Sequence, residues 1–201
     1  MQKLLIATTN AGKVREFETL FRGMPVELVS LKSIAGFKEV PETGTTFSEN
    51  ALLKAKGYAA QSGLMTLAED SGLCCDALEG APGVYSARFA GEAKGDEANN
   101  QKLLGLLENL PVNCRGAHYE SHIAIVSEKG DLIGACVGRV FGVIHPQPIG
   151  TEGFGYDPIF FYPPFQKTFG QVTLEEKNKV SHRFNAMQKA KQILGKHLPV
   201  A

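Results

Sequence analysis

The order of apolar segments constrains the fold of this chain most strongly. Up to Ala68, apolar runs of strand length alternate with segments in which apolar residues recur at helical spacing, as Val14, Phe17 and Leu20 do. This alternation is typical of α/β proteins. Two later runs, at 117–127 and 132–143, are joined by a short turn and predict a hairpin. We therefore expect an α/β fold with a mixed sheet rather than a purely parallel one.

Local signals define the remaining elements. Thr46 and Glu49 predict a capping box at the start of a helix that ends at Gly63, and Thr173 with Glu176 predicts another. The predicted strands are residues 3–8, 26–31, 64–68, 117–127, 132–143 and 158–161. The predicted helices contain residues 14–21, 46–62, 96–109, 173–176 and 181–194.

Charge and length restrict the class of protein. The 201 residues include 21 Lys and Arg against 21 Asp and Glu, so the net charge is zero. This balance argues against a protein that coats nucleic acid and against a basic membrane-surface module. It hides local sign, because residues 167–201 carry seven Lys or Arg against two Glu, whereas residues 39–76 carry six acids against two Lys. Without a convincing linker or repeat, we expect a single domain over residues 1–201, with a cleft between two lobes.

The cysteines and the apolar runs indicate a cytoplasmic protein. The four cysteines contain no C-x-x-C pair, and we interpret them as reduced thiols half-buried in strands. No run approaches the ~20 apolar residues that span a bilayer, and the first run is too short for a signal peptide.

The segment Thr8–Lys13 follows the first predicted strand and begins the first predicted helix. Free backbone N–H groups at a helix start favour an anion, Gly12 permits close approach, and Lys13 adds a positive charge. The first glycine of a Walker A loop is missing. This pattern predicts a phosphate site. In the alternative interpretation, Asn10 is a simple N-cap and Lys13 is solvated.

An acidic group follows in the sequence: Glu42, Glu49, Glu69, Asp70 and Asp76. Carboxylates beside a phosphate site suit Mg²⁺, which takes one or two carboxylates together with phosphate oxygens and water. Glu49 is better explained by its capping box, Asp76 by surface exposure, and Glu69 by pointing away from Asp70 on a strand. Asp70 and the loop residue Glu42 are therefore the candidate metal ligands.

Two later segments are candidates for binding a base. In Gly150–Pro158, three glycines alternate with two aromatic residues, and Asp157 can accept a hydrogen bond; a structural turn explains this pattern equally well. In the segment from Lys177 to Arg183, the arginine offers a donor fork suited to the O6 and N7 edge of a 6-keto purine. The alternative is a solvated basic helix face.

Taken in order, these motifs resemble the inosine triphosphate pyrophosphatase-like family, the dITP/XTP pyrophosphatases that remove non-standard purine nucleotides. The resemblance covers nearly the whole chain. It rests on T-x-N-x-G-K near the N-terminus, E-T-G-x-T-F-x-E-N at 42–50, E-D-S-G-L at 69–73, A-P-G-V-Y-S-A-R at 81–88, G-F-G-Y-D-P-I-F at 153–160 and S-H-R at 181–183.

This resemblance implies a long mixed sheet with flanking helices, two lobes around a central substrate cleft, and usually a homodimer. It implies Mg²⁺-dependent hydrolysis of ITP, dITP or XTP to the monophosphate and pyrophosphate, with Asp70 as the base and Glu42 and Asp70 as the metal ligands. The residues that it implies for substrate binding are Thr8, Thr9, Asn10, Ala11, Gly12, Lys13, Ser71, Phe154, Gly155, Tyr156, Asp157, Lys177, His182 and Arg183.

Asp70 raises a question of basicity. A free aspartate has a pKa near ~3.9, and a nearby cation lowers it further. We therefore expect Asp70 to be a weak base that positions the attacking water. Mg²⁺ is expected to supply much of the catalytic effect by acidifying that water and neutralising charge on the phosphates.

Two other functions remain open at this point. One is the related class of septum-formation-inhibitor-like pyrophosphatases, which act on pyrimidine or modified nucleotides. The other is a nucleotide sensor or RNA-binding module without turnover, which the acidic residues near the predicted phosphate site disfavour.

Overall fold

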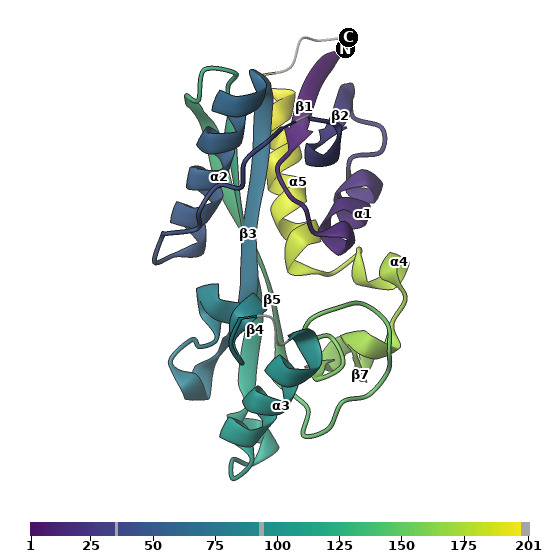
Figure 1. Ribbon diagram of the computed structural model, residues 1–201. Coiled ribbons are helices and arrows are strands. Elements are labelled where there is room, and N and C mark those ends of the chain that lie inside the picture. Colours follow the sequence, from purple (N-terminus) through teal and green to yellow (C-terminus); the bar gives the residue numbers. More distant parts are fainter. Residues whose placement is uncertain (35, 93–94, 198–201) are drawn as a thin grey trace. The chain divides into compact units, whose positions relative to one another are not determined.

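The computed structural model describes residues 1–34, 36–92 and 95–197. Over those residues, seven strands form one sheet in the order β2-β1-β3-β4-β5-β6-β7 (Figure 1). β1 is parallel to β2 and β3, whereas β6 is antiparallel to β5 and β7. The predicted α/β class, with a mixed sheet flanked by helices, is confirmed.

The strands are β1 (Gln2–Ile6), β2 (Val26–Ser30), β3 (Met65–Cys75), β4 (Gly116–Val126), β5 (Leu132–Ile144), β6 (Phe160–Tyr162) and β7 (Lys167–Thr168). The α-helices are α1 (Ala11–Leu20), α2 (Phe47–Ser62), α3 (Gly95–Leu107), α4 (Leu174–Lys177) and α5 (His182–Gly195). β4 and β5 are neighbours in the sheet and are joined by a turn in which Ser127 N–H donates to Asp131 O over 2.8 Å, as the predicted hairpin requires.

The chain divides into two compact units. Unit 1 comprises Met1–Asp70, Ser121–Gly138 and Arg183–Ala201, and unit 2 comprises Ser71–Glu120 and Arg139–His182. The strands β3, β4 and β5 each contribute residues to both units. The single domain and the central cleft stay predictions.

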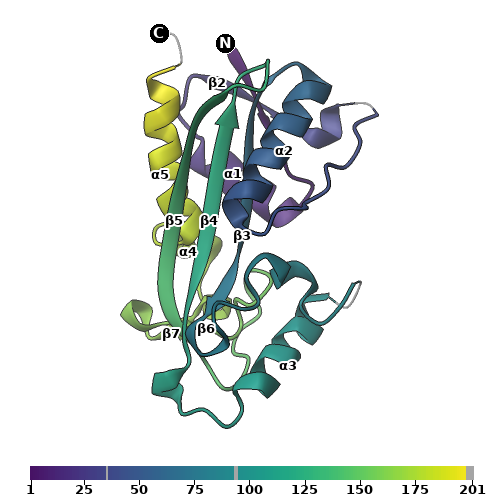
Figure 2. The same cartoon turned by 90° about the vertical axis from the view of Figure 1, so that its left-hand side faces the viewer.

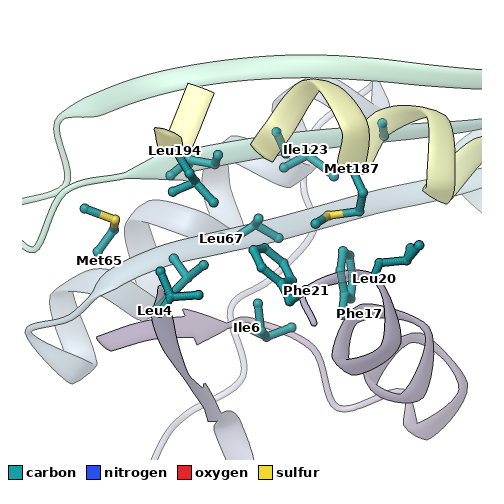
Figure 3. Close-up of a cluster of buried hydrophobic side chains, with 14 residues drawn as sticks. Leu4, Ile6, Phe17, Leu20, Phe21, Met65, Leu67, Ile123, Met187 and Leu194 are labelled. Carbon is teal, nitrogen blue, oxygen red and sulfur yellow. The ribbon is translucent and has the colours of Figure 1, made fainter. Parts of the chain in front are cut away.

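Unit 1 has a hydrophobic core on each face of its part of the sheet. On one face, Leu4 and Ile6 of β1 belong to a cluster with residues of α1 and α5 (Figure 3). On the other face, Leu5 packs with Ala51 and Ala55 of α2. Figure 1 and Figure 2 accordingly place α2 and α5 on opposite sides of β3 and β4. Because successive strand residues point to opposite faces, β1, β2, β3 and β4 contribute residues to both cores.

Unit 2 has a core of aromatic rings. The ring centroids of Tyr119 and Phe160 lie 4.7 Å apart, and those of Phe160 and Phe169 lie 5.0 Å apart. Leu103 and Leu107 of α3 are fully buried in the same cluster. Tilted aromatic pairs of this kind stabilise a core beyond their buried area. The glycine-rich segment before β6 packs against this core through Tyr156 and Ile159.

The capping signals of the sequence are confirmed. At the start of α2, Thr46 Oγ1 accepts from Glu49 N–H over 3.2 Å, and Glu49 Oε2 accepts from Thr46 N–H over 3.1 Å. Gly63 ends the helix with a φ of 64°, in the left-handed region that favours glycine. The box of Thr173 and Glu176 also forms, at the start of α4.

The third strand differs from its prediction. The sequence predicts a strand at 64–68, but β3 extends to Cys75. The polar residues from Glu69 to Gly72 follow the predicted strand, yet Glu69 and Asp70 are buried in β3, where charged partners stabilise both carboxylates. Leu73 and Cys75 then return to the core of unit 2. The extension places both acids inside a strand rather than in a loop.

The cysteines are free thiols in three environments. Cys74 and Cys75 are buried in β3, Cys136 is partly buried in β5, and Cys114 is exposed. The expectation of a half-buried position in a strand is wrong for Cys114, which ends the 3-10 helix Val112–Cys114. Within the described part of the chain, every helix is too short or too polar to cross a membrane.

Candidate functional site

The segment after β1 forms a capped helix start. Asn10 Oδ1 accepts from the backbone N–H groups of Gly12 and Lys13, over 2.9 and 3.1 Å. Thr8 Oγ1 accepts from Asn10 N–H over 3.2 Å. Asn10 is thus the N-cap of α1, as the alternative interpretation predicts, and two N–H groups that could face an anion donate to it. Phosphate binding by the Thr8–Lys13 segment stays a prediction.

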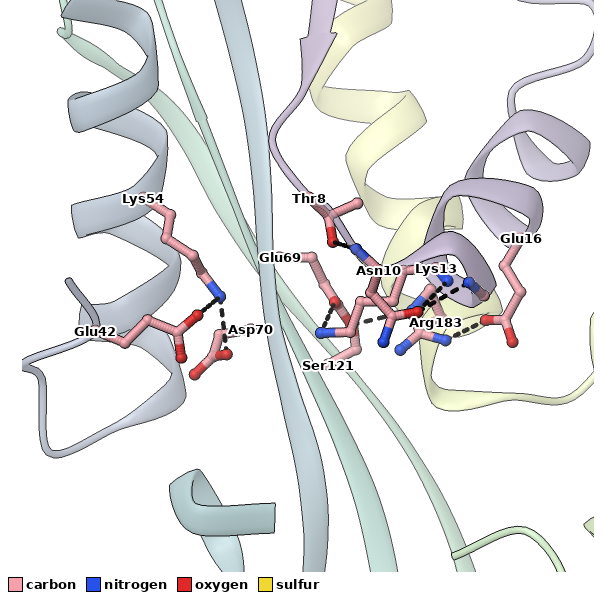
Figure 4. A network of polar contacts seen from close by, with 11 residues as sticks. Thr8, Asn10, Lys13, Glu16, Glu42, Lys54, Glu69, Asp70, Ser121 and Arg183 are labelled. Carbon is pink, nitrogen blue, oxygen red and sulfur yellow. Dashed lines mark hydrogen bonds and ion pairs between the residues drawn. The ribbon is translucent and has the colours of Figure 1, made fainter. Parts of the chain in front are cut away.

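On the α2 side of β3, a lysine joins the two predicted metal ligands. Lys54 Nζ lies 2.8 Å from Glu42 Oε1 and 3.0 Å from Asp70 Oδ1. Glu42 comes from the loop before α2, Lys54 from α2 and Asp70 from β3, and Figure 4 shows the three side chains converging. The structure therefore brings Glu42 and Asp70 together, as the sequence predicts, around a cation that the sequence analysis did not name.

The electrostatics of Asp70 differ from the expectation. Burial raises the pKa of the Asp70 carboxyl above its ordinary value, although Lys54 and Lys13 act to lower it. Burial acts to lower the pKa of the Lys54 ammonium, but the carboxylates of Asp70 and Glu42 raise this pKa above its ordinary value. The expected lowering of the Asp70 pKa is wrong because desolvation outweighs the nearby cations. Asp70 is consequently a better proton acceptor when ionised than a free aspartate.

On the opposite side of β3, Glu69 forms a second charged network with residues of unit 1 (Figure 4). Glu69 Oε2 lies 2.8 Å from Lys13 Nζ, and Glu69 Oε1 accepts from Ser121 Oγ over 2.9 Å and from Arg183 Nε over 3.1 Å. Arg183 also pairs with Glu16 of α1. The predicted divergence of Glu69 from Asp70 is confirmed.

Arg183 is fully buried in this network. The side chains of Arg183 and Glu16 are each 1% exposed, and that of Glu69 is 0% exposed. Burial acts to lower the pKa of the guanidinium, but the carboxylates of Glu69 and Glu16 raise it above its ordinary value. The guanidinium therefore binds two protein carboxylates, and its reading of a purine edge stays a prediction.

In unit 2, three other predicted substrate residues are connected to Asp157, two of them directly and one through Tyr119. Lys177 Nζ lies 2.6 Å from Asp157 Oδ2, which also accepts from Phe154 N–H over 2.9 Å. The ammonium group of Lys177 is 4.8 Å from the centroid of the Phe154 ring. Tyr119 donates from its hydroxyl to Asp157 Oδ1 over 3.4 Å and stacks on His182 at a centroid distance of 4.8 Å. These contacts connect the G-F-G-Y-D segment with the segment before α5.

The other predicted residues of unit 2 have mainly structural contacts. The ring of Tyr156 is buried in the core, and its hydroxyl donates to Ser86 O over 2.8 Å. Gly155 N–H donates to Asp96 Oδ2 over 2.6 Å. A side chain at Gly153 is excluded, because its Cβ would lie 2.0 Å from Asp157 Oδ2. Ser71 is a partly buried residue of β3.

Sequence reasoning missed two buried charges, Lys54 and Glu16. Lys54 occurs between Ala51 and Tyr58, which are spaced to face the core of α2, so its position predicted burial. Glu16 likewise precedes the buried Phe17 of α1. A charged residue at a buried position of a helix was the available signal, since such a residue is retained only with a partner.

The donor set of Glu42 and Asp70 suits a hard divalent cation. Both carboxylates converge on one positive group, the ammonium of Lys54. In the described residues no cluster of three His, Cys, Asp or Glu side chains could hold a metal ion. Mg²⁺ does not require one, because it is commonly held by one or two carboxylates and by oxygens of a bound phosphate. The residues therefore fit Mg²⁺ together with a phosphate ligand.

Comparisons with known proteins identify the family of this chain. The sequence profile of the Ham1 family matches residues 4–193. A protein named dITP/XTP pyrophosphatase from Desulforamulus reducens is 48% identical, and the match covers 96% of this chain and 96% of that protein. A protein of the same name from Geobacter sulfurreducens is also 48% identical, and the match covers 97% of this chain and 98% of that protein. A HAM1 protein structure from Coxiella burnetii matches with a TM-score of 0.89 and 37% identity, covering 98% of this chain and 100% of that chain. The Staphylococcus aureus Ham1 structure matches with a TM-score of 0.87 and 38% identity over the same shares. The chain belongs to the Ham1 family.

Proposed function

We propose that this protein is a nucleoside-triphosphate pyrophosphatase that removes dITP, XTP and ITP from the nucleotide pool. The nucleotide is cleaved by water between its α- and β-phosphates and yields the monophosphate and pyrophosphate. The observation that carries this proposal is the pair of carboxylates, buried Asp70 and the more exposed Glu42, that converge on Lys54 in unit 1. Names of relatives at 48% identity support the substrate class.

Asp70 is the proposed base. Its pKa is raised by burial, so its ionised form accepts a proton from water more readily than an exposed aspartate does. Lys54 supplies the opposite charge at 3.0 Å, which favours the ionised form of that carboxylate. Asp70 thus takes the proton of the attacking water, while Lys54 limits the rise of its pKa.

Mg²⁺ is the proposed cofactor, with Glu42 and Asp70 as its protein ligands. When bound, it neutralises phosphate charge and acidifies water. The segment Thr8–Lys13 is the proposed triphosphate-binding element, with the ammonium group of Lys13 as its positive charge. Lys13 side-chain exposure is 15%, which leaves the ammonium partly accessible to solvent.

A further group of residues is proposed to bind the nucleoside. In unit 2, the ion pair of Asp157 and Lys177 and the ring of Phe154 offer a carboxylate, an ammonium and an aromatic face for a nucleoside. Arg183 is proposed to contribute in addition to its bonds with Glu16 and Glu69. The full proposed set in this group is Ser71, Phe154, Gly155, Tyr156, Asp157, Lys177, His182 and Arg183.

The substrate class is tested by pyrophosphate release. We expect release from ITP, dITP and XTP with Mg²⁺ and none without it. GTP shares the 6-keto edge and differs at the 2-amino group, so exclusion there is expected to slow it by about 10- to 200-fold. Faster release from dTTP or UTP than from ITP would favour the septum-formation-inhibitor-like class instead. Tight binding of ITP without release would favour a nucleotide sensor.

Asp70→Asn tests the role of the base. The amide cannot accept the proton, so we expect binding of ITP to persist while kcat falls at least about 100-fold. Asp76→Asn is the matched control, because Asp76 is exposed in unit 2, and its kcat is expected to equal that of the wild type. Undiminished turnover by Asp70→Asn would refute the role of Asp70.

The homodimer and the cytoplasmic location are proposed from the resemblance and from the reduced thiols. A particle mass of twice the 21.7 kDa chain, measured by sedimentation, is expected for the dimer.

A further inference from the structure

Glu69 stands at the centre of a buried chain of alternating charges. The chain of charges runs from Glu16 through Arg183 and Glu69 to Lys13, and each of these residues forms an ion pair with the next one. Three elements supply it, because Lys13 and Glu16 belong to α1, Glu69 to β3 and Arg183 to α5. Lys13 is the member that solvent reaches most, at 15% side-chain exposure, whereas the other three are 0–1% exposed.

The two oxygens of Glu69 have different partners. Oε1 accepts from Ser121 Oγ over 2.9 Å and from Arg183 Nε over 3.1 Å, whereas Oε2 faces Lys13 Nζ at 2.8 Å. The contacts at Oε1 fix the orientation of the carboxylate, since a buried charge is stable only when its partners are in place. Oε2 is therefore held in a defined direction, toward the start of α1.

A lysine side chain is otherwise difficult to localise. Its four-carbon stem has many rotamers, and this freedom is lost whenever the ammonium is immobilised. A fixed carboxylate at 2.8 Å removes much of that freedom before any ligand binds. The ammonium has three N–H donors, so a contact with Glu69 leaves donors for a phosphate oxygen.

We propose that Glu69 is a positioning residue that holds the Lys13 ammonium group ready to bind the triphosphate of the substrate. This inference rests on the proposed function, in which Lys13 binds phosphate. Glu69 does not itself touch the substrate. It acts through Lys13, and Ser121 and Arg183 keep Glu69 in place.

A double-mutant cycle tests this role. Glu69→Gln keeps an oxygen for Ser121 and Arg183 but presents no negative charge to Lys13. We expect it to weaken the binding of inorganic triphosphate, measured by calorimetry, about tenfold. KM for dITP is expected to rise by a similar factor while kcat stays within about twofold. In a Lys13→Ala background, Glu69→Gln is expected to have no further effect on either quantity.

Glu16→Gln is the matched control. It makes the same substitution in the same chain of charges, but at the carboxylate that pairs with Arg183 instead of the one that pairs with Lys13. We expect it to lower the melting temperature and to leave triphosphate affinity unchanged. Ser121→Ala provides a milder test if Glu69→Gln does not fold, since it removes one hydrogen bond from Oε1. A small rise in KM that disappears in the Lys13→Ala background is expected.

Three outcomes would overturn the proposal. The first is that Glu69→Gln binds triphosphate more tightly than the wild type does. The second is that the effects of Glu69→Gln and Lys13→Ala are additive in the double variant. The third is that Glu16→Gln and Glu69→Gln lose affinity for triphosphate equally. Failure of the proposed function is distinguishable, because the wild type would then not hydrolyse dITP. Calorimetry with inorganic triphosphate would still measure the coupling between Glu69 and Lys13.

Discussion

At the scale of single residues, the site depends on two buried cations, each paired with carboxylates. Lys54 has two carboxylate partners, and Arg183 has two others, which come from elements distant in sequence. A buried ion loses its hydration, and an opposite charge at close range must replace it. Removing one member therefore changes the protonation of its partners as well as the stability of the fold.

Lys54→Met is expected to shift the acid limb of the pH–rate profile. The rate rises with pH as Asp70 becomes ionised. Burial raises the pKa of Asp70 and Lys54 lowers it, so loss of the ammonium raises that pKa further. The acid limb of kcat/KM should then move to higher pH. Lys56→Met, which changes an exposed lysine of the same helix, should leave the profile in place. An unshifted limb in Lys54→Met would show that Asp70 does not control it.

At the scale of elements, the sequence predicted what short segments determine. The capping box of Thr46 and Glu49 and the glycine at position 63 are local signals, and α2 begins and ends with them. The end of β3 was predicted wrongly because Glu69 and Asp70 interrupt the apolar run, and their partners are unknown from the sequence. Those partners are distant, since Arg183 is 114 positions from Glu69. Candidate residues could thus be chosen from motifs, whereas their pairing could not.

Thr46→Ala tests the contribution of the cap to α2. Loss of the side-chain acceptor leaves Glu49 N–H without its partner, and the free energy of unfolding should fall by about 1 kcal/mol. Urea denaturation measures this change, and KM for dITP should stay at the wild-type value. Thr46→Ser, which keeps the hydroxyl, is the control and should retain most of the stability. A loss in Thr46→Ser equal to that in Thr46→Ala would indicate that the methyl group matters instead.

At the scale of the whole molecule, three strands belong to both units. A break in β3, β4 or β5 would remove backbone from the core of each unit, so we expect the two units to unfold together. The chain itself supplies a probe, because it has no Trp and five Tyr, of which only Tyr58 belongs to unit 1. Tyrosine fluorescence therefore reports mainly on unit 2, and far-ultraviolet circular dichroism reports on both.

The two signals are expected to give the same urea midpoint. Their agreement would follow from the shared strands, and the wild-type chain is sufficient for the measurement. A tyrosine transition at lower urea than the circular dichroism transition would mean that unit 2 unfolds independently.

The adjacent acids of β3 make this strand sensitive to changes in its length. Glu69 and Asp70 serve networks on opposite faces of the sheet only because their positions differ by one residue. Inserting or deleting a single residue shortly before them would turn each carboxylate to the other face. Lys13 and Lys54 would then both lose their partners through one change, whereas any substitution removes only one of the two. Both charged networks therefore depend on the register of β3 in the sheet.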